Sequence, residues 1–133
     1  MQTLYEKTTA KKKGAVIDRI KTFEDACDDH GIDKLQLELL GLNEGATKAV
    51  VAYIKILIIT KALNEGWVAD LSNTNQYKYY PWFKKPSGFG LAFYDFVNWG
   101  SYSCVGVRLA FKSAELAEYA GKQFIDIYND FIL

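Results

Sequence analysis

The sequence predicts an α+β protein whose helices and strands are segregated along the chain. Apolar side chains recur mostly at helical spacing over residues 15–65. Residues 77–111 are rich in aromatic and β-branched residues, and residues 113–131 return to helical spacing. We therefore expect N-terminal helices including one central apolar helix, then a small antiparallel sheet of about three aromatic-rich strands, then a C-terminal amphipathic helix.

Length and charge limit the domain count and the partners. The 133 residues fit one domain, which we place at residues 15–133 behind a basic polar arm of residues 1–14. Sixteen basic and sixteen acidic residues cancel, which argues against a protein built mainly to grip a phosphate backbone.

The N-terminal part begins with an expected helix over Ala15–His30. Val16, Ile20, Phe23 and Cys27 share one face, and Gly31 is suited to end the helix. Residues 33–42 are ambiguous, because their leucines fit both a strand and a helical face, with turn residues slightly favouring a short helix.

The strongest helical pattern runs from Glu44 to about Glu65, with Asn43 as N-cap and Gly66 as the stop. Its apolar residues cover most of the circumference, so this helix is expected to run through the middle of the domain.

The aromatic stretch is expected to be β structure. Tyr77–Phe83 is one strand, and Pro81 makes it an edge strand or ends it there. A turn at residues 84–88 leads to two further strand candidates, Gly90–Trp99 and Ser103–Phe111. Short turns of this kind favour an antiparallel meander.

The last element is a helix capped by Ser113. Its expected inward stripe is Leu116, Ala120, Phe124, Ile127 and Phe131, and Glu118 and Lys122 form an outward i,i+4 pair.

The strongest candidate surface lies within Tyr77–Lys85, where aromatics alternate with lysines. A strand directs Tyr77, Tyr79, Pro81 and Phe83 to one face and Lys78, Tyr80, Trp82 and Lys84 to the other. If the first set is core, the second leaves large aromatics beside lysines, including the adjacent Lys85. Such a surface suits a protein interface or single-stranded nucleic acid; the alternative is that the lysines merely keep a packed sheet soluble.

The pattern contains no catalytic, metal or cofactor set. Cys27, Asp28, Asp29 and His30 are ligand types, but adjacent positions on a helix point apart. Cys104 resembles a small buried residue rather than a nucleophile. Arg108 is either a solvated arginine or a contact for an anion or partner on the open sheet face. We therefore do not expect an enzyme.

Several segments resemble one family of small uncharacterised proteins from Bacteroidetes and from the phages and prophages of these gut bacteria. The resemblance is carried by YKYYPWF (residues 77–83), SGFG (87–90) and VGVRLAFKSAELAEYAGKQFIDIYNDF (105–131), with FEDAC (23–27) and KALNEGW (61–67). It implies a phage-linked or mobile-element protein, in the bacterial cytoplasm or a virion, and it implies no activity or cofactor.

The expected function is a non-enzymatic interaction protein that binds a protein partner or itself, as a virion component or a factor that blocks a host protein. The runner-up is a single-stranded nucleic-acid binder that uses Tyr80, Trp82, Lys84 and Lys85. The N-terminus lacks the apolar core of a secretory signal. The longest apolar run, Ala49–Ile59, is interrupted by Lys55 and too short to span a membrane, so no membrane partner is expected.

Overall fold

The computed structural model describes residues 14–32, 48–86, 88, 90–100 and 106–133. The elements are α2 (Val16–Arg19), α3 (Phe23–His30), α5 (Lys48–Asn64), β1 (Lys78–Lys84), β2 (Ala92–Trp99), the 3-10 helix η1 (Val107–Leu109), α6 (Ala114–Gln123) and α7 (Ile125–Ile132). The α+β class is confirmed. The predictions for residues 33–42, for Asn43 as N-cap and for nearly all of the N-terminal arm lie outside the described residues.

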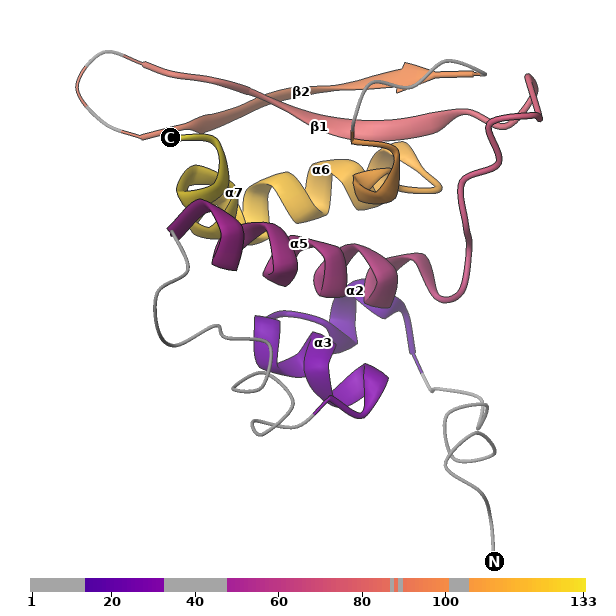
Figure 1. Ribbon diagram of the computed structural model, residues 1–133, viewed down its shortest axis with the longest axis horizontal. Coiled ribbons are helices and arrows are strands. Elements are labelled where there is room, and N and C mark those ends of the chain that lie inside the picture. Colours follow the sequence, from indigo (N-terminus) through magenta and orange to yellow (C-terminus); the bar gives the residue numbers. More distant parts are fainter. Residues whose placement is uncertain (1–13, 33–47, 87, 89, 101–105) are drawn as a thin grey trace, which may run out of the picture.

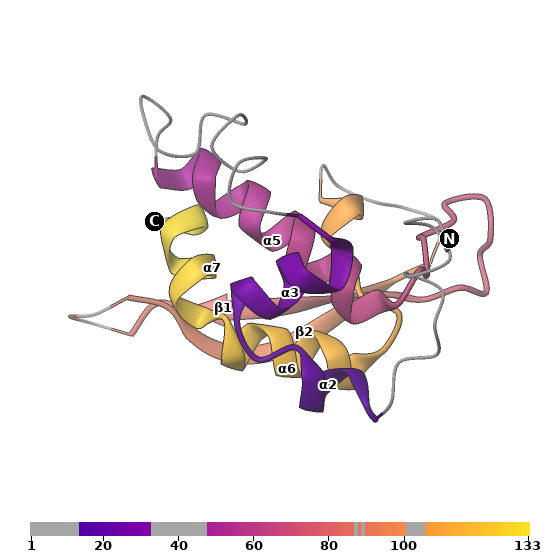
Figure 2. The same cartoon turned by 90° about the horizontal axis from the view of Figure 1, so that it is seen from below.

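The helices are stacked beneath the two-stranded sheet (Figure 1). The β1–β2 sheet lies over α6 and α7, α5 runs beneath them, and α3 packs against α5 on the side away from the sheet, with α2 nearer α6 (Figures 1 and 2). The prediction that the apolar helix is central is confirmed, because α5 contacts α3, α6, α7 and η1. Its buried Ile56, Ile59 and Leu63 join Phe111 and Phe124 in the core.

The helix expected over Ala15–His30 is broken into α2 and α3. Thr22 begins a new helix: its side chain accepts from the backbone N–H of Asp25, and the Asp25 carboxylate accepts from the N–H of Thr22. This is a capping box, a local signal that outweighs the continuous apolar spacing. Gly31 ends α3 as expected, in the left-handed conformation at φ 66°.

The end of α5 positions the chain that follows the sheet. Asn64 is buried; its amide N–H donates to the Ala110 carbonyl at 2.8 Å, and its Oδ1 accepts from the Lys112 N–H at 3.0 Å. Phe111, which lies between Ala110 and Lys112, exchanges two backbone hydrogen bonds of 2.7 and 3.0 Å with Tyr79 of β1. The segment 110–112 is thus held between α5 and β1.

The third strand expected over Ser103–Phe111 is not confirmed. Residues 107–109 form η1 instead of a strand. Phe111 contributes a single isolated β-bridge, to Tyr79, and residues 103–105 lie outside the described residues. Local bonds from Leu109 N–H to the Gly106 carbonyl and from Ala110 N–H to the Val107 carbonyl satisfy this backbone. Residues 106–110 therefore form a tight turn rather than a ladder.

The C-terminal helix is also divided, at Phe124. Ser113 caps α6 as expected by accepting from the Leu116 N–H, and α6 packs under both strands. Phe124 leaves helical geometry (φ −110°, ψ 28°), and α7 then turns to pack on α5. One straight helix could not cover both surfaces, which explains the break.

Close approach of α6 to the sheet requires a glycine. A Cβ at Gly121 would lie 2.5 Å from Phe93 and 2.9 Å from Pro81. The glycine costs helix propensity but lets the sheet rest directly on the helix.

Candidate interaction surface

The inner face of the sheet is formed by alternate residues of β1. Tyr79 and Phe83 pack against the core, and the ring centroids of Phe83 and Tyr128 are 4.9 Å apart. Pro81 lies over Gly121. The predicted alternation holds for these three residues. It is wrong for Tyr77, which precedes β1 and is 55 % exposed.

The outer face carries the large exposed aromatics. Trp82 is 56 % exposed and Tyr94 of β2 is 60 % exposed, and their rings meet edge to face with centroids 6.4 Å apart. The Lys84 ammonium lies 5.1 Å from the centre of the Tyr94 ring, a cation–π contact. Together with the half-buried Tyr80, these residues form what we call the outer patch: Tyr80, Trp82, Lys84 and Tyr94.

Tyr94 reaches this face because of a β-bulge. Trp82 pairs with Asp95 and Phe83 pairs with Phe93, so Tyr94 is the extra residue of β2. The bulge brings a second aromatic ring beside Trp82. Sequence reasoning missed Tyr94 as a surface residue, because alternation alone does not show where a register shift occurs.

Lys78 does not belong to this surface, although the sequence analysis placed it there. Its side chain is fully buried, and its ammonium donates to the backbone carbonyls of Asn73, Gln76 and Gly100 at 3.2, 2.8 and 2.8 Å. The turn before β1 folds over the lysine and removes it from solvent.

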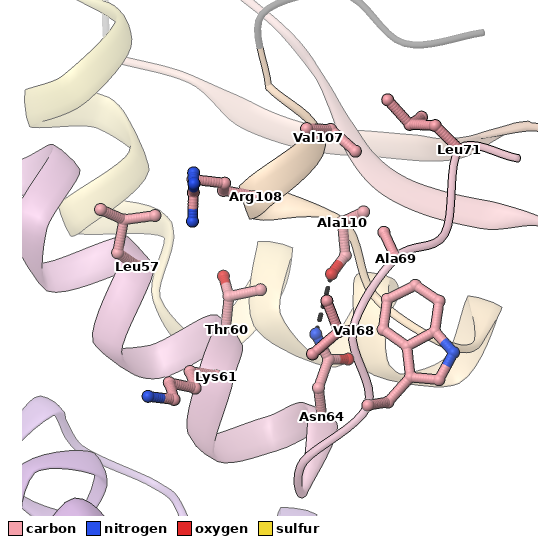
Figure 3. A pocket seen from close by; sticks show the side chains of 11 residues that line it. Leu57, Thr60, Lys61, Asn64, Val68, Ala69, Leu71, Val107, Arg108 and Ala110 are labelled. Atoms are coloured by element: carbon pink, nitrogen blue, oxygen red, sulfur yellow. Dashed lines mark hydrogen bonds between the residues drawn. The ribbon is translucent and has the colours of Figure 1, made fainter. Parts of the chain in front are cut away.

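The other two predicted cations lie in different places. Lys85 is exposed at the end of β1, next to the outer patch. Arg108 is also exposed, but it lies on η1 and not on an open sheet face. There it lines a pocket that η1 forms with α5 (Figure 3). The outer face of β1 therefore carries Tyr80, Trp82 and Lys84, the exposed Lys85 directly follows the strand, and Lys78 and Arg108 lie elsewhere.

Cys27 and His30 of α3 were the ligand types that the sequence offered together. Within the described ranges, no group of three or more His, Cys, Asp or Glu side chains could hold a metal ion. Cys27 is buried; burial, together with Glu24 and Asp28, raises the pKa of its thiol, which makes it a poor nucleophile. Cys104 lies outside the described residues.

No protein-family model matches this chain, and no match was found among curated proteins or solved structures. In the part of the chain that the structure describes, no helix is long and apolar enough to cross a membrane.

Proposed function

We propose that this protein is a non-enzymatic interaction protein that binds another protein surface through the outer patch. One observation carries the proposal: Trp82 and Tyr94 are adjacent, more than half exposed, and lie on a sheet face that no described helix covers (Figure 1). Large rigid aromatics supply most of the binding energy at protein interfaces, because they bury much area at a small entropy cost. The phage or prophage context stays a prediction from the sequence.

The partner to which we commit is a second copy of this chain. The outer patch and its border carry both signs of charge, since Lys84 lies two residues after Trp82 on β1 and the exposed Asp95 pairs with Trp82 across the strands. A twofold interface needs such self-complementarity, because the same surface meets itself. The chain has no net charge, so two copies do not repel each other at long range.

The face of the sheet is favoured over its edge. Among the described residues β2 has no second strand neighbour, which would offer an edge for pairing. However, the bulge at Tyr94 and the charge of Asp95 lie in the middle of that edge. Bulges and charges are devices that discourage edge-to-edge pairing.

Nucleic acid is the weaker candidate. Stacking on Trp82 and Tyr94 beside Lys84 and Lys85 would suit a single strand. However, the Lys78 ammonium is buried and hydrogen-bonded to backbone carbonyls, and Arg108 lies on η1. Two of the four cations expected on this face, which were Lys78, Lys84, Lys85 and Arg108, are therefore missing from it. The Lys84 ammonium already lies over an aromatic ring.

The test is the mass of the protein by light scattering behind a sizing column, over a range of concentrations. We expect a dimer for the wild type, and Trp82→Ala or Tyr94→Ala to raise its dissociation constant at least about thirtyfold, as loss of a hot spot does. Because Trp82 is 56 % exposed, its removal should change the free energy of unfolding by no more than about 1 kcal/mol.

Ile17→Ala is the control, because Ile17 is an exposed apolar residue on α2, outside the outer patch. It should leave the dimer intact. A wild type that stays monomeric at every concentration would contradict self-association. A salt-sensitive complex with oligo-dT, lost in Lys84→Glu with Lys85→Glu, would favour nucleic acid instead.

A further inference from the structure

A second site lies on the side of α5, away from the outer patch. A pocket of about 530 Å³ opens between the last two turns of α5, the chain that follows it, and η1 (Figure 3). Its volume falls within the usual range for small-molecule sites. The lining residues are Leu57, Thr60, Lys61, Asn64, Trp67, Val68, Ala69, Leu71, Val107, Arg108 and Ala110.

The charge of this lining has one sign. It contains Lys61 and Arg108 and no acidic residue. Among the described residues neither cation makes an ion pair, whereas the nearby Glu65 is engaged by Arg19 and Lys112. Figure 3 shows the Arg108 side chain extending from η1 toward Leu57, across one end of the pocket. The pocket therefore offers positive charge without a counter-charge of its own.

The remaining walls are mostly apolar, and their polar groups are occupied or covered. The Asn64 amide already bonds Ala110 and Lys112. The Thr60 hydroxyl is shielded from solvent and lies beside that of Tyr128, without a hydrogen bond of good geometry between them. A ligand would thus meet an apolar surface, including Trp67, and charged donors at the rim.

We propose that this pocket binds a small organic carboxylate with an apolar body. The apolar body would pack on Leu57, Val68 and Trp67, and the carboxylate would accept hydrogen bonds from the Arg108 guanidinium, with Lys61 adding positive charge. Arginine is the side chain whose planar set of donors matches a carboxylate. This site shares no residue with the outer patch and does not depend on the proposed function.

Naphthoate is a suitable probe, and naphthylmethanol and naphthylmethylamine are its neutral and cationic counterparts. The chain has three tryptophans, whose indole N–H resonances can be followed by NMR and assigned with Trp67→Phe and Trp82→Phe. We expect naphthoate to shift the Trp67 resonance in a saturable way and to leave that of Trp82 unchanged. The alcohol should bind about tenfold more weakly or worse, and the amine not measurably.

Arg108→Gln should raise the dissociation constant for naphthoate about tenfold, and Lys61→Gln should raise it less. Because Arg108 is exposed, folding does not depend on it. Lys85→Gln is the matched control, a lysine outside the pocket that should bind naphthoate like the wild type. The proposal is overturned if naphthoate leaves the Trp67 resonance in place, if the alcohol binds equally well, or if Arg108→Gln binds as tightly as wild type.

Discussion

Lys78 occupies a strand position expected to face solvent, yet its side chain is among the largest that are fully buried in the described residues. The ammonium joins three backbone carbonyls: two in the turn before β1 and one at Gly100, beyond the end of β2. Burying a charge is costly unless it is hydrogen-bonded, and three charge-assisted bonds supply that compensation. Lys78 therefore fixes the turn to the end of the hairpin.

We expect Lys78→Met to lower the free energy of unfolding by roughly 2–4 kcal/mol, because it leaves three carbonyls without their donor. Urea unfolding followed by circular dichroism measures this loss. Lys85→Met is the control: Lys85 is exposed, so its replacement should change stability by less than about 0.5 kcal/mol. Equal stability of the two variants would show that the buried ammonium contributes nothing.

At the scale of single elements, the start of α3 is fixed by the capping box of Thr22 and Asp25. The Asp25 carboxylate accepts from the backbone N–H groups of Lys21 and Thr22 at 3.0 and 2.9 Å. These two bonds are the main reason that the pKa of Asp25 lies below its ordinary value of 3.8. The carboxylate thus stabilises the helix in its ionised form.

This shift gives a dependence of stability on pH. A lowered pKa in the folded state means that the contribution of Asp25 is complete above its ordinary value and is lost as pH falls through the folded value. We expect the urea midpoint to decrease below about pH 4 in the wild type, and to decrease less in Asp25→Asn, which lacks this titration. If the urea midpoint fell equally in the two proteins below about pH 4, the prediction would be contradicted.

At the scale of the whole molecule, polar contacts fasten α2 and α3 to the rest. The Tyr119 hydroxyl donates to the Ile20 carbonyl at 2.6 Å, and the Gln123 amide donates to the Lys21 carbonyl at 2.9 Å. Arg19 bonds Asp29 on α3 and Glu65 at the end of α5. The bonds from Tyr119 and Gln123 use the backbone carbonyls freed where α2 and α3 separate.

A pair of tyrosines tests this fastening. Tyr119→Phe should lower the free energy of unfolding by about 1–2 kcal/mol, because the Ile20 carbonyl loses its donor. Tyr128→Phe should be nearly neutral, because the buried Tyr128 hydroxyl makes no hydrogen bond with the described residues. Hydrogen exchange should also show faster opening of α2 and α3 in Tyr119→Phe alone. Equal losses in the two variants would exclude a special role for the Tyr119 bond.

Much of this architecture could be predicted because it depends on neighbours in the sequence. The apolar circumference of α5, the cap at Ser113, the stop at Gly31 and the alternation of Tyr79, Pro81 and Phe83 all depend on contacts within a few residues or on one periodic face. Local spacing and capping fix such features directly. Alternation likewise placed Trp82 on the face opposite these three residues, but it left open which of the two faces is exposed.

The tertiary structure decided what depends on distant segments. Lys78 is buried by a carbonyl 22 residues away, Arg108 meets α5 instead of an open sheet, and the Tyr94 bulge sets a register that alternation does not contain. The break at Phe124 arises because α6 must cover the sheet while α7 covers α5. By itself the sequence determined which residues form the main helices and strands, since local periodicity encodes them. Which polar side chains remain at the surface depended on packing between segments far apart in the chain.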